Sequence, residues 1–460
     1  MKFKNIKIAA LAFTLSVVTF SCSRDFTETV FNQDEIAGDW KTTDQMHSFV
    51  LGAYVDMRQE EYYGKDFQLF AEVRSDEMFS NGASGYYQTV YNYNMLSNDG
   101  YARNTYERIY KVVAKANNLI NFDINKLDNA AANQVEANYY VGQAYALRAL
   151  GFFDLLRLYG QKYSGGDTGI VLPLKFDPLA KQGRSSVADA EKQIESDFNN
   201  ALQKMTASKA RDNYANKTEL SINGLKGLMA RYYLYKKDFA KVKSLVDDIV
   251  GSGNYKIVEA DAVVNSWSPT VNNATQNSIF ELAFGTAGMT GATSYSNMIN
   301  STGYANTVIK ADLVSKYDAN DVRLKLINQS GATYFLDGKY PDINGSNNVK
   351  IVRYEEIILD GAEAELSLGN TAKALEYYNM ILTNRGLTAA TSVTMDAIQL
   401  ERAKELLGEG FRMWDLLRWG KEVPRPTNAS KDIRLTIFPI PRAETDIAGT
   451  LVKSNPGYDN

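Results

Sequence analysis

The segment ERAKELLGEGFRMWDLLRWG, residues 401–420, carries the most distinctive pattern of this chain. Apolar side chains recur in it at helical spacing, between charges of both signs. The apolar set predicts a buried stripe of Leu406, Leu407, Phe411, Trp414 and Leu417. The charged set can pair with neighbouring helices, and it consists of Arg402, Glu409, Arg412, Asp415 and Arg418. We therefore expect the segment to specify the fold, with ligand contact as the alternative.

Two earlier segments resemble each other and indicate a helical scaffold. Residues 230–242 and 362–374 each predict a helix, a tight polar turn at Asp238 or Asn370, and the start of a returning helix. Small residues let the two helices of such a pair approach closely, as in the tetratricopeptide helix pair. The two segments lie too far apart to be tandem repeats. The chain therefore reads as mainly α, with a large insertion between two helix pairs.

Further helices are expected over 140–158 and from Ser186 onward. Apolar residues lie on one face of the first, which is expected to end at Gly160. The second begins at a capping box formed by Ser186 and Asp189. Both are amphipathic and extend the scaffold toward the N-terminus.

Two stretches have a different texture, rich in glycine, asparagine and aromatic residues. They are residues 255–345 and residues 81–101. Glycine and asparagine mark turns, so we expect loops with a few short strands, such as Ser278 to Phe284. Binding residues concentrate on loops that a rigid scaffold holds. These two stretches are therefore where a ligand site is expected.

The N-terminus has the layout of a bacterial lipoprotein signal. Lys2, Lys4 and Lys7 precede an apolar stretch from Ile8 to Phe20, which is too short to span a membrane, and Cys22 follows directly. We expect residues 1–21 to be removed and Cys22 to carry the lipid anchor. The alternative is an ordinary secretory signal with Cys22 as a bystander.

The composition excludes several classes of function. His47 is the only histidine and Cys22 the only cysteine, so His-metal clusters, Ser-His-Asp triads and disulfides are not expected. The formal charge is −4, and no basic patch indicates a nucleic acid partner. No cofactor and no metal site are predicted. Glu405, Glu409 and Asp415 could be paired glycosidase acids, but the arginines around them favour ion pairs.

The segment at 401–420 resembles the signature of the SusD/RagB family of outer-membrane nutrient-binding lipoproteins. Further matches run through the chain in order, namely the lipoprotein signal, Leu147-Arg148-Ala149, Asp154 to Gly160, Arg353 to Glu356, Ala362-Glu363-Ala364, Phe438-Pro439-Ile440-Pro441 and Asn455-Pro456-Gly457-Tyr458. The resemblance implies a single SusD-like domain over 22–460. Its expected parts are an N-terminal helical part (22–254), the loop-rich insertion (255–345) and a C-terminal helical part (346–460).

The resemblance also implies a function. Family members lie in the outer membrane, anchored by lipid and facing the cell exterior. They capture oligosaccharides, or peptides in RagB-like members, and act as the lid of a SusC-like TonB-dependent β-barrel transporter. On this basis we expect a glycan-binding lipoprotein of a nutrient-import system and no enzymatic activity.

Sugars stack their C–H faces on aromatic rings, while amide groups bind their hydroxyls. The aromatic and amide residues of the loop-rich stretches are therefore our candidates for the ligand site, and they are Trp267, Tyr86, Tyr87, Tyr295, Tyr304, Asn81, Asn297 and Asn300. For each ring the alternative is ordinary packing. A RagB-like peptide-binding protein, a surface glycosidase and a purely structural surface protein remain the alternative functions.

Overall fold

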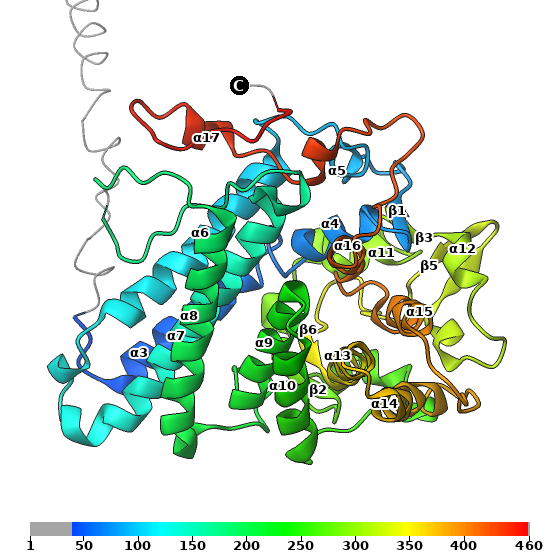
Figure 1. The fold of residues 1–460 in the computed structure, drawn as a ribbon, viewed down its shortest axis with the longest axis horizontal. Helices are drawn as coiled ribbons and strands as arrows, with labels where there is room; N and C mark the ends of the chain where they lie inside the picture. The colour runs from blue at the N-terminus through cyan, green and yellow to red at the C-terminus, as the bar shows by residue number, and fades with distance from the viewer. Residues whose placement is uncertain (1–38, 178, 459–460) are drawn as a thin grey trace, which may run out of the picture. The chain divides into compact units, whose positions relative to one another are not determined.

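Helices dominate the computed structural model, as the helical spacing predicted (Figure 1). The structure describes residues 39–177 and 179–458, so the predicted signal peptide and the predicted lipid anchor at Cys22 lie outside the described residues. The helices are α3 (Thr43–Met57), α4 (Asp66–Val73), α5 (Gln88–Tyr91), α6 (Gly100–Asn121), α7 (Ala130–Tyr159), α8 (Val187–Ala207), α9 (Ile222–Lys236), α10 (Phe239–Gly251), α11 (Tyr295–Ile299), α12 (Ala311–Val314), α13 (Tyr354–Ser367), α14 (Thr371–Thr383), α15 (Met395–Leu406), α16 (Arg412–Arg418) and α17 (Arg442–Thr445). Among these described helices, none has both the length and the apolar character that a membrane span requires.

Helix α7 is the centre of the N-terminal helical layer, between α6 and α8 (Figure 1). Two glycines allow this close packing. A Cβ atom at Gly142 would lie 2.6 Å from Met205 of α8, and one at Gly151 would lie 3.0 Å from Val113 of α6. The helix ends at Gly160, as predicted. Small residues thus set the spacing of this layer.

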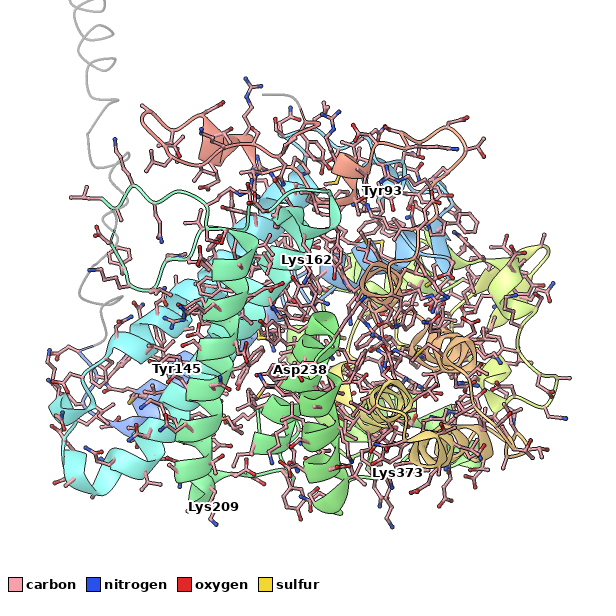
Figure 2. All side chains as sticks on the ribbon, viewed as in Figure 1. Tyr93, Tyr145, Lys162, Lys209, Asp238 and Lys373 are labelled. Carbon is pink, nitrogen blue, oxygen red and sulfur yellow. The ribbon has the colours of Figure 1, made fainter. Side chains whose placement is uncertain are left out.

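The two predicted helix pairs are present as α9 with α10 and α13 with α14, and α10 packs against α13. Lys237, between α9 and α10, adopts a left-handed conformation with φ of 59°. Asp238, labelled in Figure 2, then caps α10 by accepting a hydrogen bond from the Lys241 N–H at 3.2 Å. The polar turn of the sequence is therefore the point where the chain reverses.

The strands are short and form two antiparallel sheets. They are β1 (Met78–Ser80), β2 (Ser278–Leu282), β3 (Thr307–Ile309), β4 (Asn328–Ser330), β5 (Thr333–Phe335) and β6 (Val349–Arg353). One sheet has the order β1-β3-β5-β4, and β2 pairs with β6 in the other. Strand β2 confirms the strand expected from Ser278. Strand β1 precedes one loop-rich stretch and β3 lies in the other, so their pairing joins the two stretches.

The signature segment forms the end of α15, a tight loop and α16. Trp414, Leu406 and Leu407 are buried, and Phe411 and Leu417 are half-buried, so most of the predicted stripe is confirmed. These charges pair partly with a neighbouring helix, as expected, and partly within the segment or with β6, as Glu409 does with Arg353. Arg418 binds Glu363 of α13, and the Arg402 guanidinium lies 3.0 Å from Asp415.

Arg74 joins the end of α4 to two distant parts of the chain. It is 1% exposed and donates hydrogen bonds to the Val90 carbonyl at 2.9 Å and the Thr436 carbonyl at 3.0 Å. Its guanidinium also lies 4.3 Å from the ring centroid of Tyr93, which Figure 2 labels. Arg74 therefore holds α4 in place beside the loop that carries Tyr86 and Tyr87.

Candidate functional site

Two of the predicted tyrosines lie together on the surface. Tyr304 is 42% exposed and Tyr86 is half-buried, and their ring centroids are 5.4 Å apart with an interplanar angle of 41°. They come from the two loop-rich stretches, which the pairing of β1 with β3 brings side by side. We call Tyr86 and Tyr304 the tyrosine pair. An open aromatic surface of this kind suits the apolar face of a ring-shaped polar ligand.

Asn306 is the residue that holds the tyrosine pair together, and sequence reasoning missed it. Its side chain is fully buried, and its Nδ2 donates to the Tyr86 carbonyl at 2.9 Å and to the Ser80 hydroxyl at 3.0 Å. Ala305, beside it, takes a left-handed conformation with φ of 51°. Nothing distinguishes Asn306 from the other asparagines of the stretch until β1 and β3 are paired.

The predicted asparagines support these loops. Asn81 donates from Nδ2 to the Ala305 carbonyl at 2.7 Å and accepts from the Ala83 N–H at 2.9 Å. Asn297 accepts the Tyr304 N–H at 2.9 Å. Both residues lie beside the tyrosine pair, but their amide groups are already used in holding it. Their role as direct ligand contacts stays a prediction.

For Asn300, the structure contradicts the prediction of a direct ligand contact. It is 5% exposed, and its Oδ1 accepts hydrogen bonds from the Thr302 N–H at 2.9 Å and the Thr302 hydroxyl at 2.7 Å. Such a turn satisfies the amide oxygen locally. Asn300 therefore shapes the loop and is buried, so it is not the exposed polar contact that was predicted.

Trp267 and Tyr295 are also corrected, because both are buried. Trp267 is 5% exposed and Tyr295 is 3% exposed, and each packs edge-on against Tyr340, at 5.0 and 5.2 Å between centroids. The Tyr295 hydroxyl donates to the Gly408 carbonyl in the signature segment. Both rings are therefore packing residues and not a stacking platform, and Tyr295 also joins the insertion to the signature segment.

Tyr87 is fully buried beneath the tyrosine pair and is likewise corrected. Its ring stacks on Tyr101 at 4.9 Å, and its hydroxyl donates to Asp66 Oδ1 at 2.6 Å. Burial raises the pKa of Asp66 to about 6, although the Lys65 ammonium opposes this. Lys65 Nζ lies 5.8 Å from the Tyr86 ring centroid. The tyrosine pair therefore borders a charged group that sequence reasoning did not single out.

The acids considered as a glycosidase pair are held in buried ion pairs. Glu405, Glu409 and Asp415 are each 5% exposed or less. Burial alone would raise the pKa of Glu405, but Arg385 and Arg353 outweigh it and hold that pKa well below its usual range. A carboxylate with so low a pKa is a poor proton donor at neutral pH. Ion pairing accounts for all three residues.

Other possible sites are a metal centre and the cavities of the molecule. Within residues 39–177 and 179–458, no group of three or more histidine, cysteine, aspartate or glutamate side chains could hold a metal ion. A cavity of about 1180 Å³ lies between α6 and the segments 171–177, 179–182 and 444–452. It is lined by none of the predicted ligand residues. A smaller cleft of about 400 Å³ adjoins the pair through Gly85 and Lys65.

Comparison with known proteins agrees with this architecture. A model of the SusD family matches residues 187–433, which is more than half of the chain. A second model, described as starch-binding and associating with the outer membrane, matches residues 34–234. The two matches together span both loop-rich stretches and the signature segment.

Relatives and solved structures extend the similarity over nearly the whole chain. A SusD-like protein from Formosa agariphila is 24% identical, with 95% of this chain and 96% of the relative aligned. A SusD superfamily protein from Bacteroides thetaiotaomicron is 26% identical with a TM-score of 0.80, covering 90% of this chain and 100% of that one. The fold also matches surface glycan-binding protein A from Bacteroides fluxus, at 20% identity and a TM-score of 0.72 over 91% of this chain and 100% of that one. The chain therefore belongs to the SusD family.

Proposed function

We propose that this protein binds glycans at the cell surface and passes them to a transporter. The exposed tyrosine pair carries the proposal, because two rings from different loops are held at one surface by the buried Asn306. Aromatic faces with polar groups beside them suit sugar rings. A solved protein of the same fold is named as a surface glycan-binding protein, which supports this ligand class.

We also propose how the protein is attached to the membrane and which partner receives the glycan. Cys22 anchors the protein to the outer membrane through lipid, in agreement with the family model that describes outer-membrane association. The protein then acts as the lid of a SusC-like TonB-dependent transporter. It captures its ligand without cleaving it, since the acids that could form a glycosidase pair are committed to buried ion pairs.

Replacing Tyr304 with alanine should weaken glycan binding by about 1–3 kcal/mol, the scale of stacking on an aromatic side chain. The melting temperature should stay unchanged, because the ring is 42% exposed. An initial panel identifies glycans that bind the protein without its lipid anchor. Calorimetry with these glycans then measures the effect. Tyr214, 46% exposed, is the matched control, and Tyr214→Ala should bind as the wild type does.

The panel should contain plant, host and microbial glycans together with peptide mixtures. Glycan binding that Tyr304→Ala weakens supports the proposal. Glycan binding that neither Tyr304→Ala nor Tyr86→Ala changes would mean that the site lies elsewhere. Binding of peptides alone would support the RagB-like function and would show that the tyrosine pair is not a surface for stacking sugars.

A further inference from the structure

A polar cleft lies beside the tyrosine pair and is not used by the site described above. Its volume is about 400 Å³, within the range of small-ligand sites. Three parts of the chain form it, namely the turn between α3 and α4, the loop before α5, and the first turns of α6. The lining residues that matter here are Glu60, Lys65, Gln88, Asp99, Gly100 and Asn104.

The cleft and the tyrosine pair are continuous. Gly85, at the edge of the cleft, directly precedes Tyr86 in the chain. Lys65 lines the cleft, and its Nζ lies 5.8 Å from the Tyr86 ring centroid. Tyr101 also lines the cleft, and its ring stacks on that of Tyr87, whose centroid lies 6.3 Å from the Tyr86 centroid. A chain-like ligand on the pair can therefore enter the cleft without leaving the surface.

The charges of the cleft select among ligands. Four carboxylates line it, and they belong to Glu60, Glu61, Asp66 and Asp99. Among the described residues that line the cleft, the one cation is Lys65, whose Nζ lies 3.1 Å from Glu60 and 3.5 Å from Asp66. Its charge is thus already balanced, and Glu61 is paired with Arg108 of α6 at 3.2 Å. The carboxylates of Glu60, Asp66 and Asp99 still outnumber the single charge of Lys65, so the cleft keeps a negative excess. Such a field repels carboxylate and sulfate groups, while amide and carboxylate oxygens accept hydrogen bonds from neutral hydroxyls.

We propose that this cleft is a second subsite, which takes an uncharged sugar unit of the same glycan chain whose neighbouring unit lies on the tyrosine pair. The inference rests on the proposed function. It adds that the natural ligand is a neutral glycan long enough to occupy both places. Anionic glycans such as polyuronates are excluded by the carboxylates of the cleft.

Gly100 gives a direct way to fill the cleft. It is the first residue of α6 and lines the cleft, and a Cβ atom placed on it would meet nothing within 4 Å. A large side chain there can occupy the cleft with no clash at its first atom. Gly100→Trp is therefore the blocking variant, and Gly100→Ala is the matched control that leaves the space open. Asn104→Trp blocks the same cleft from the next turn of α6.

The experiment compares binding of oligosaccharide length series to these variants by calorimetry. The probes are neutral gluco-, xylo-, manno- and galacto-oligosaccharides and, as anionic counterparts, oligogalacturonides and alginate oligosaccharides. For the neutral series that binds, wild type and Gly100→Ala should gain affinity with chain length. Gly100→Trp and Asn104→Trp should bind long chains with about tenfold lower affinity than the wild type. They should bind the shortest chains as the wild type does.

The outcomes separate this inference from the proposed function. If Tyr304→Ala weakens binding but both tryptophan variants, folded by their melting curves, bind long chains normally, the second subsite is wrong and the tyrosine pair stands. Stronger binding of the anionic series than of any neutral series also overturns the subsite. If no glycan binds, or if Tyr304→Ala and Tyr86→Ala change nothing, the proposed function fails and the subsite fails with it.

Discussion

Replacing Arg353 with methionine should lower the free energy of unfolding by about 3–5 kcal/mol, the cost of removing one partner from a buried ion pair. Arg353 is 3% exposed, and its guanidinium lies 2.7 Å from Glu409 and 2.8 Å from Glu405. Methionine preserves much of the packing but leaves these carboxylates short of positive charge. Urea unfolding followed by circular dichroism measures the effect.

The cluster around Arg353 makes the loss large because acids already outnumber bases there. The bases are Arg323, Lys339, Arg353 and Arg385, and the acids are Asp321, Glu355, Glu401, Glu405 and Glu409. Arg434→Met is the matched control, since Arg434 pairs with Asp432 on the exposed surface. It should unfold as the wild type does. Equal unfolding of Arg353→Met and the wild type would show that the ion pairs do not hold the helices together.

The free energy of unfolding of Arg353→Met should depend less on pH than that of the wild type. Arg353 and Lys339 hold the pKa of Glu409 below its usual range, although burial alone would raise that pKa. A carboxylate with a lowered folded-state pKa stabilises the fold fully above its unfolded-state pKa of about 4.3. This contribution is lost as the pH falls through the folded-state pKa. Unfolding curves recorded between neutral and acidic pH should therefore converge for Arg353→Met and the wild type.

Replacing Trp414 with alanine should also cost about 3–5 kcal/mol of unfolding free energy, as for other buried aromatic residues. The Trp414 ring is 6% exposed, stacks near Phe67 of α4 at 6.2 Å, and lies 4.9 Å from the Arg157 guanidinium of α7. Its removal leaves a cavity where α16, α4 and α7 meet. Thermal melts and urea unfolding measure the loss.

Phe176 is the control for Trp414, because it is a large aromatic residue that is 59% exposed. Phe176→Ala should leave the melting temperature unchanged. If Trp414→Ala melts at the wild-type temperature, the interpretation of residues 401–420 as the part that specifies the fold is wrong. A lower melting temperature for both variants would show that aromatic truncation in general, and not the position of Trp414, causes the loss of stability.

The helical scaffold could be predicted from the sequence because its signals are local. The turn at Asp238 and the helices on either side of it depend on residues within a few positions of each other, and α9 and α10 follow that pattern. The same holds for the end of α7 at Gly160 and for the buried stripe that contains Trp414. Helical periodicity records which face of a segment is buried, so it reports the core directly.

The candidate site could be predicted only in part, because loop-rich stretches have no periodicity. Trp267 and Tyr304 both stand among glycines and asparagines, yet one ring is 5% exposed and the other 42%. The surroundings that decide this lie far away in the chain, as Tyr340 does for Trp267. Residue type and local composition therefore pointed to the stretches that carry Tyr86 and Tyr304 but did not separate surface rings from packing rings.

By itself the sequence determined the helix pairs, the signature segment and the resemblance to the SusD family, since all of these rest on short-range patterns. Only the tertiary structure decided which of the candidate rings meet at the surface. The pairing of β1 with β3 and the hydrogen bond from Asn81 to the Ala305 carbonyl, 224 residues away, bring Tyr86 and Tyr304 together. The same folding buries Tyr87 and Tyr295 and opens the cleft beside Lys65. Contacts between strands distant in sequence depend on the whole chain, and no local pattern encodes them.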